Sequence, residues 1–150
     1  MSYSIGWSKV TQFVRAKELI KENNSIFYFE VIKPVGDNEE WKIARDVIEE
    51  FYEFCEKNKK QFSIIMDASK LEVVDIMNAI QWVVLFLKHK DITSEFVTCS
   101  CLVTTSVNVK QGVWYFLKYY SPIKPFVVES TATEARTFIE SHVLQKDIPC

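Results

Sequence analysis

The segment from Ile76 to Leu87, IMNAIQWVVLFL, constrains the fold of this chain more than any other. Ten of its twelve side chains are apolar, and only Asn78 and Gln81 are polar. At about 100° per residue the apolar groups surround almost the whole of a helix, whereas a surface helix shows a single apolar stripe. We therefore expect this helix to be buried on more than one side, by its own domain or by another molecule.

Length and composition indicate one globular domain. The chain has 150 residues, of which 48% are hydrophobic, with three Gly and four Pro. This is enough to bury a core without a metal or disulfides. We expect a single domain over residues 1–150, with a core over about 26–143 and a frayed tail over 145–150.

Charge and hydropathy exclude several classes of partner. A formal net charge of −2 gives no strongly basic surface, so nucleic acid is not an expected partner. No apolar run reaches the roughly 18 residues that a transmembrane helix needs, and the first ten residues lack a signal-peptide stretch. The four cysteines lack the spacing of a disulfide framework. We expect a cytoplasmic protein with no transmembrane segment.

Hydrophobic periodicity predicts alternating helices and strands after an N-terminal β-hairpin at Asn23-Asn24. Residues 9–22 fit either a strand or a helix. Such alternation favours right-handed crossovers and an α/β fold with a mostly parallel or mixed sheet of four to five strands and about four helices. The predicted strands cover about 25–33, 62–66, 97–105 and 126–128, and the predicted helices about 39–57, 75–89, 108–120 and 132–144.

Two stretches of the chain resemble STAS domains, the family of anti-sigma-factor antagonists and of the cytoplasmic domains of sulfate transporters. FSIIMDASKLEVVDIMNAI has an apolar strand, then Asp67-x-Ser69, then Asp75 opening a helix. PIKPFVVESTATEARTFI resembles the closing strand and helix, with Glu134-Ala135 early in that helix. The resemblance spans roughly residues 26–143. It implies a STAS-like fold and a non-enzymatic protein-interaction role.

The chain departs from the STAS pattern at one position, and a second family offers an alternative to the resemblance. Phosphorylation-switched family members have Ser or Thr directly after the second Asp, whereas Ile76 and Met77 follow Asp75 here. The usual switch is therefore expected to be absent. Lipid-binding domains of the Sec14 type share a similar final half and are the nearest confusable family. They imply a carrier or sensor of a small hydrophobic ligand such as a lipid.

Polar residues at the end of the central predicted strand are the candidates for a ligand site. Asp67, Ser69 and Asp75 lie near the edge where open α/β sheets usually bind ligands. The simpler interpretation makes Asp75 a helix cap and Asp67 a turn residue. We favour this second interpretation.

The remaining reactive side chains form no catalytic constellation. Cys99 and Cys101 point to one face of a predicted strand, where small buried hydrophobes are a better interpretation than a metal or redox pair. His89 and His142 each stand alone. We expect no enzymatic activity, no cofactor and no metal.

A second apolar helix, around Trp114 to Tyr120, completes the list of candidate surfaces. With the helix at 76–87 it would form either a protein interface or the wall of an apolar pocket. We favour a protein-interaction module that forms a homodimer or docks on another protein, with a hydrophobic small molecule as the alternative ligand. The interface candidates are Met77, Trp82, Val84, Leu85, Phe86, Trp114, Tyr115 and Tyr119.

Overall fold

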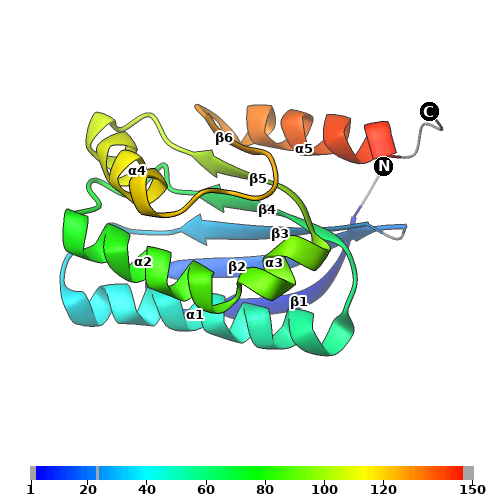
Figure 1. Ribbon diagram of the computed structural model, residues 1–150, viewed down its shortest axis with the longest axis horizontal. Helices are drawn as coiled ribbons and strands as arrows, with labels where there is room; N and C mark the ends of the chain where they lie inside the picture. The colour runs from blue at the N-terminus through cyan, green and yellow to red at the C-terminus, as the bar shows by residue number, and fades with distance from the viewer. Residues whose placement is uncertain (1–2, 23, 147–150) are drawn as a thin grey trace.

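The computed structural model describes residues 3–22 and 24–146, with side chains as far as residue 142 (Figure 1). One mixed sheet forms its centre, and its six strands are hydrogen-bonded in chain order. The first three are antiparallel neighbours, and the third to the sixth run parallel. The strands are β1 (Ser4–Val10), β2 (Val14–Lys21), β3 (Asn24–Val31), β4 (Phe62–Asp67), β5 (Val97–Val103) and β6 (Phe126–Glu129).

Five helices cover the two faces of this sheet unequally (Figure 1). Four of them lie on one face, and the last helix packs on the other against β4, β5 and β6. This is the arrangement that right-handed crossovers between neighbouring parallel strands produce. The helices are α1 (Asn38–Asn58), α2 (Ile76–Lys88), α3 (Lys90–Phe96), α4 (Val107–Tyr119) and α5 (Ala132–Lys146).

The α/β class and the single mixed sheet agree with the sequence analysis, but its counts of strands and helices were too low. Residues 9–22, which fitted either a strand or a helix, contain no helix: they hold the end of β1, a turn at 11–13 and the whole of β2, which pairs with β1 on one side and β3 on the other. The expected hairpin is therefore a three-stranded meander, whose second turn begins at Glu22 with φ 58°. The long apolar helix stops at Lys88, and the chain enters the short helix α3 at Lys90.

Two further details concern the C-terminal part of the chain. Helix α5 continues to Lys146, two residues beyond its expected end. Residues 147–150, within the segment expected to be a frayed tail, lie outside the described residues. In the part of the chain that the structure describes, no helix is both long enough and apolar enough to span a membrane.

Helix α1 has a well-defined start and end. The Asp37 side chain accepts the Glu40 backbone N–H at 2.9 Å, and the Glu40 carboxylate accepts the Asp37 N–H at 3.3 Å, which makes a capping box. At the other end Lys59 adopts the left-handed region (φ 47°, ψ 50°), and its N–H donates to the Cys55 carbonyl. A left-handed residue after a helix is usually Gly, because a side chain there is strained.

The Lys59 conformation leads to a prediction. We expect Lys59→Gly to raise the free energy of unfolding by about 1 kcal/mol, because glycine adopts the left-handed region without strain. For a chain of this length the gain corresponds to a melting temperature about 2–4 °C higher, which circular dichroism measures. Lys57→Gly, inside the helix, is the control and should lower stability by about 1 kcal/mol. A loss of stability in both variants would contradict the prediction.

Candidate docking face and apolar cavity

Helix α2 lies between α1 and α4 (Figure 1). Several of its apolar side chains are exposed to water. The Asp75 carboxylate caps the helix by accepting the Asn78 backbone N–H at 2.8 Å. Met77, Val84 and Leu87 have exposed fractions of 63%, 57% and 49%. These values lie far above those of core residues, so part of the apolar surface of α2 is not covered by the domain.

Three of the predicted interface residues lie toward the interior instead. Leu85 is buried in the core. The half-buried Trp82 packs its ring edge-on against Trp41 of α1, with centroids 6.3 Å apart. The half-buried Phe86 packs in the same way against Phe116 of α4, at 5.6 Å. These rings join α2 to its neighbours, so we remove Leu85, Trp82 and Phe86 from the candidate interface.

Helix α4 packs against α2 and also exposes aromatic side chains to water. Trp114 and Tyr119 are exposed, and Tyr115 is half-buried with its ring against that of Trp114. The Lys118 ammonium lies 4.3 Å from the centre of the Trp114 ring, a cation–π contact. We call this surface the α2–α4 face. Its members are Ile76, Met77, Ile80, Val84, Leu87, Trp114, Tyr115 and Tyr119.

Sequence reasoning missed Ile76, Ile80 and Leu87 as members of this face. A signal was available, because Met77, Ile80, Val84 and Leu87 recur at spacings of three and four. Such residues share one stripe of a helix. The sequence alone does not show which of several apolar stripes faces the sheet.

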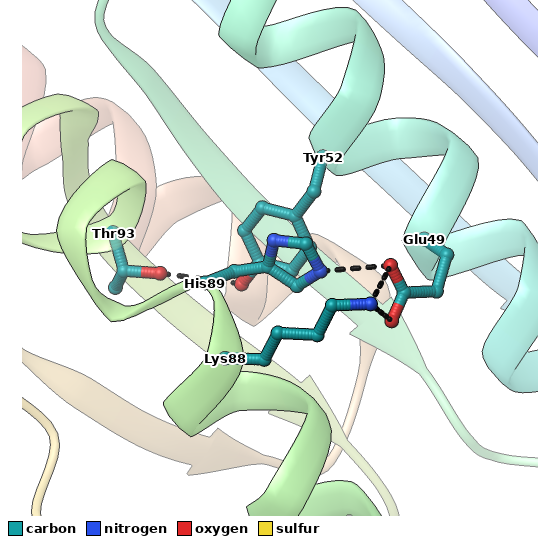
Figure 2. A network of polar contacts seen from close by, with 5 residues as sticks. All are labelled: Glu49, Tyr52, Lys88, His89 and Thr93. Carbon is teal, nitrogen blue, oxygen red and sulfur yellow. Dashed lines mark hydrogen bonds and ion pairs between the residues drawn. The ribbon is translucent and has the colours of Figure 1, made fainter.

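A polar cluster fixes the end of α2 against α1 (Figure 2). Glu49 of α1 lies 2.8 Å from His89 Nε2 and 3.2 Å from Lys88 Nζ, so both partners bind one carboxylate. Burial raises the pKa of Glu49, but the hydrogen bonds from His89 and Lys88 outweigh burial and lower it overall. The Tyr52 ring stacks on the His89 ring at 4.3 Å, and its hydroxyl lies 3.2 Å from Thr93 Oγ1. The cluster holds α2 and α3 in place and leaves the outward side of α2 open.

The candidate ligand-edge residues make internal contacts. Asp67 Oδ1 accepts the backbone N–H and the hydroxyl of Ser69 at 3.0 and 2.6 Å, and Asp67 Oδ2 accepts the Tyr28 hydroxyl at 2.8 Å. Burial, and then the hydrogen bond to Asp67, raise the pKa of Tyr28 well above its usual range. The Asp75 carboxylate accepts hydrogen bonds from the backbone and side-chain amides of Asn78, at the start of α2. In the structure Asp67 therefore stabilises a turn, and Asp75 caps the start of a helix.

The two strand cysteines are buried on one face of β5. The Cys99 sulfur lies 3.6 Å from the hydroxyl of Ser63, which is also buried. Burial raises the pKa of the Cys101 thiol to about 12, so the reactive thiolate is scarce at neutral pH. Among the described residues, no group of three His, Cys, Asp or Glu side chains is placed to hold a metal ion.

An apolar cavity of about 200 Å³ lies between the sheet and helices α1, α2 and α4. Its lining residues Pro122 and Ile123, in the connection between α4 and β6, are exposed, which places an opening there. Almost all of the lining is apolar. It includes Phe29 and Ile64 from the strands and Ile48, Trp82, Phe86 and Val113 from the helices.

Comparison with known proteins identifies the fold. An uncharacterized protein of the DUF3478 family from Shewanella loihica PV-4, described as having a SpoIIAA-like fold, matches this chain with a TM-score of 0.57. The match covers 89% of this chain and 98% of that one. The chain has a SpoIIAA-like fold. This is the STAS-like fold, so the fold that the sequence resemblance implied is confirmed.

The STAS-like fold does not by itself give a function. The two chains are 12% identical, a level at which the likeness shows the fold alone. No family model matches the sequence, and no curated protein matches it. In this STAS-like fold Ile76 and Met77 form the first turn of α2, and both are exposed.

Proposed function

We propose that this domain is a non-enzymatic interaction module that docks on another protein surface through the α2–α4 face. The observation that carries the proposal is the exposure of Met77, Val84 and Leu87 along one stripe of α2. Removing apolar surface from water contributes about 25 cal/mol per Å². Apolar side chains exposed along one stripe of a helix on a folded domain favour association. The proposal includes no phosphorylation switch, because aliphatic side chains follow Asp75.

The first test asks whether the exposed stripe is needed for folding. In dilute protein with nothing bound to the stripe, we expect the triple variant Met77→Gln, Val84→Gln, Leu87→Gln to have an unfolding free energy within about 0.5 kcal/mol of that of the original chain, because these side chains meet water in the isolated domain. Leu85→Gln is the matched control, because Leu85 is next to Val84 but buried. This change should lower the free energy of unfolding by about 3 kcal/mol or more. Urea unfolding measures both. A triple variant as unstable as the control would show that the stripe belongs to the core.

The second test asks whether the stripe is covered in the cell. A photo-crosslinking benzophenone amino acid at position 84 should form a covalent adduct with another polypeptide chain on irradiation. The same group at position 133, exposed at the start of α5 on the other face of the sheet, is the control. Adducts at neither position, or equally at both, would contradict docking through α2.

The cavity favours a second candidate function, the binding of a small hydrophobic molecule. An apolar cavity of about 200 Å³ that holds no molecule leaves its lining side chains without the van der Waals contacts of a packed core, and a bound apolar molecule would restore them. Apolar cavities of about 150 Å³ bind benzene. The cavity here therefore suits a somewhat larger aromatic or short alkyl compound.

This candidate is tested with an uncharged fluorescent probe, N-phenyl-1-naphthylamine. We expect saturable binding at one site per chain, with the same affinity in the Met77, Val84, Leu87 triple variant, because the cavity does not depend on the exposed stripe. Ala44→Leu adds volume at a lining position and should weaken binding at least tenfold. Binding that is lost in the triple variant and unchanged in Ala44→Leu would assign the probe to the surface. Native mass spectrometry should also detect a retained apolar ligand.

A further inference from the structure

Three helices on the face of the sheet opposite α5 lie in the order α1, α2, α4 (Figure 1). Their charges differ across this layer. Helix α1 has seven acidic and three basic side chains. Residues 107–128, which form α4 and the segment after it, contain three lysines and no acidic residue. The layer is therefore acidic on one side, apolar along the middle and basic on the other side.

Charged side chains on both flanking helices reach water. Asp46 and Glu53 are exposed on α1, and Lys110 and Lys118 are exposed on α4. Asp46 is 3.6 Å from Lys42, but both side chains are more than half exposed, so this pair is weak. At a rise of about 1.5 Å per residue, Lys110 and Lys118 are about 12 Å apart along their helix and Asp46 and Glu53 about 10.5 Å. The two pairs therefore differ in spacing along the helix axis by one residue.

The apolar stripe between them has the spacing of a helix that packs against a parallel helix. Met77, Ile80, Val84 and Leu87 are separated by three, four and three residues. This is the a and d pattern of a heptad repeat, and Leu87 at d with Val84 at a suits a two-stranded arrangement. Fewer than two heptads do not associate by themselves. Here the helix is already folded and fixed, so less ordering is required on association.

We propose that a second copy of this chain covers the α2–α4 face in a two-fold dimer. The axis runs along α2, so the two α2 helices pack in parallel, and α4 of each protomer lies over α1 of its partner. This inference rests on the proposed docking function and names its partner. It places Lys110 and Lys118 of one protomer opposite the partner's Asp46 and the partner's Glu53.

The order of charges across the three helices favours a two-fold axis along α2 over one that runs across the helices. A two-fold interface brings the same surface patch of both copies together. With the axis along α2, the acidic helix of each copy meets the basic helix of the other. With the axis across the helices, α1 would face α1 and α4 would face α4, which places like charges together and is unfavourable. An anionic membrane surface would meet the acidic side chains of α1, which disfavours that occupant.

Charge reversal tests this arrangement by sedimentation velocity. One variant carries Lys110→Glu and Lys118→Glu, and a second carries Asp46→Lys and Glu53→Lys. Each alone should weaken self-association at least tenfold, because α4 and the partner's α1 then repel. The dimer should return when the two variants are mixed in equal amounts, and also when all four changes are made in one chain, because both cases restore opposite charges across the interface.

A matched control and the contrary results complete the test. Lys21→Glu with Arg136→Glu makes the same change in net charge as the Lys110, Lys118 variant, but beside Tyr3, and should leave the dimer intact. A chain that is monomeric at all concentrations would overturn the inference, as would equal behaviour of all the variants. If a monomer still crosslinks from position 84 to a different protein, or binds vesicles of anionic phospholipid, the second copy is wrong as the occupant. The proposed protein-docking function survives if the monomer crosslinks to a different protein. It is contradicted if the monomer binds the vesicles instead.

Discussion

Replacing Glu18 with alanine is expected to lower the free energy of unfolding by about 3 kcal/mol, because buried polar partners lose their acceptor. Glu18 is 1% exposed. It accepts the Ser25 hydroxyl at 2.7 Å, the Trp7 backbone N–H at 3.1 Å and the Lys60 ammonium at 2.7 Å. Lys60 reaches water, so its share of the loss is smaller than that of the other two donors.

Urea unfolding measures the Glu18 effect against a matched control. Glu30→Ala removes a carboxylate from the neighbouring strand β3, where the pair with Arg15 is 3.5 Å long and open to solvent. This control should change stability by less than about 1 kcal/mol. Equal losses in the two variants would show that the Glu18 contacts contribute no more than a surface ion pair.

The same carboxylate predicts a pH dependence. Burial raises the pKa of Glu18, but the hydrogen bonds from Lys60, Ser25 and Trp7 outweigh it and hold the pKa below its ordinary value. The stabilisation is therefore complete above the unfolded-state pKa of about 4.3 and is lost as the pH falls through the lower folded-state pKa. The stability difference between the original chain and Glu18→Gln should shrink as the pH falls below about 4.3. A difference that is constant with pH would contradict this assignment.

The second large effect is expected at Gly112, where α4 crosses the segment before α2. A Cβ at this position would lie 2.5 Å from Val74 Cβ and 2.6 Å from the Val74 carbonyl oxygen. Because one of these atoms belongs to the backbone, the helix must shift. We expect Gly112→Ala to lose about 2 kcal/mol, despite the helix propensity of alanine, and to melt about 4–8 °C lower.

The exposed neighbour Gln111 provides the control for Gly112. Gln111→Ala should leave the melting temperature nearly unchanged, because its side chain faces solvent. Gly112→Ala should also alter the α2–α4 face, since it displaces one helix relative to the other. A variant at Gly112 that gains stability, as an alanine in an unhindered helix would, would contradict the close approach to Val74.

The fold was predictable because local patterns and topology agree. The capping residue Asp75 and the apolar strand at Phe62 specify their elements directly from sequence. The edge strand β1 was not predictable in this way, because its exposed residues show no apolar alternation and it is held by pairing with β2. The break at His89 depends on contacts with α1 that lie 40 residues away in the chain.

The helix that forms the candidate site was predictable from the sequence, but the residues of that helix that face water were not. The sequence shows that α2 has more apolar surface than one side can bury. It does not show that Leu85 faces the core while Val84 faces water, since both are aliphatic and adjacent. The positions of α1 and α4 decide this. The cavity depends in the same way on how large side chains from several elements meet, which no local pattern specifies.

The central claim is that the outward apolar stripe of α2 is an association surface. Sedimentation equilibrium over a wide concentration range tests it most directly, with the original chain compared with Val84→Lys. We predict a mass of twice the 17.6 kDa chain for the original protein and of one chain for the variant, with unchanged circular dichroism in both. A single-chain mass for the original protein at every concentration would contradict self-association through α2.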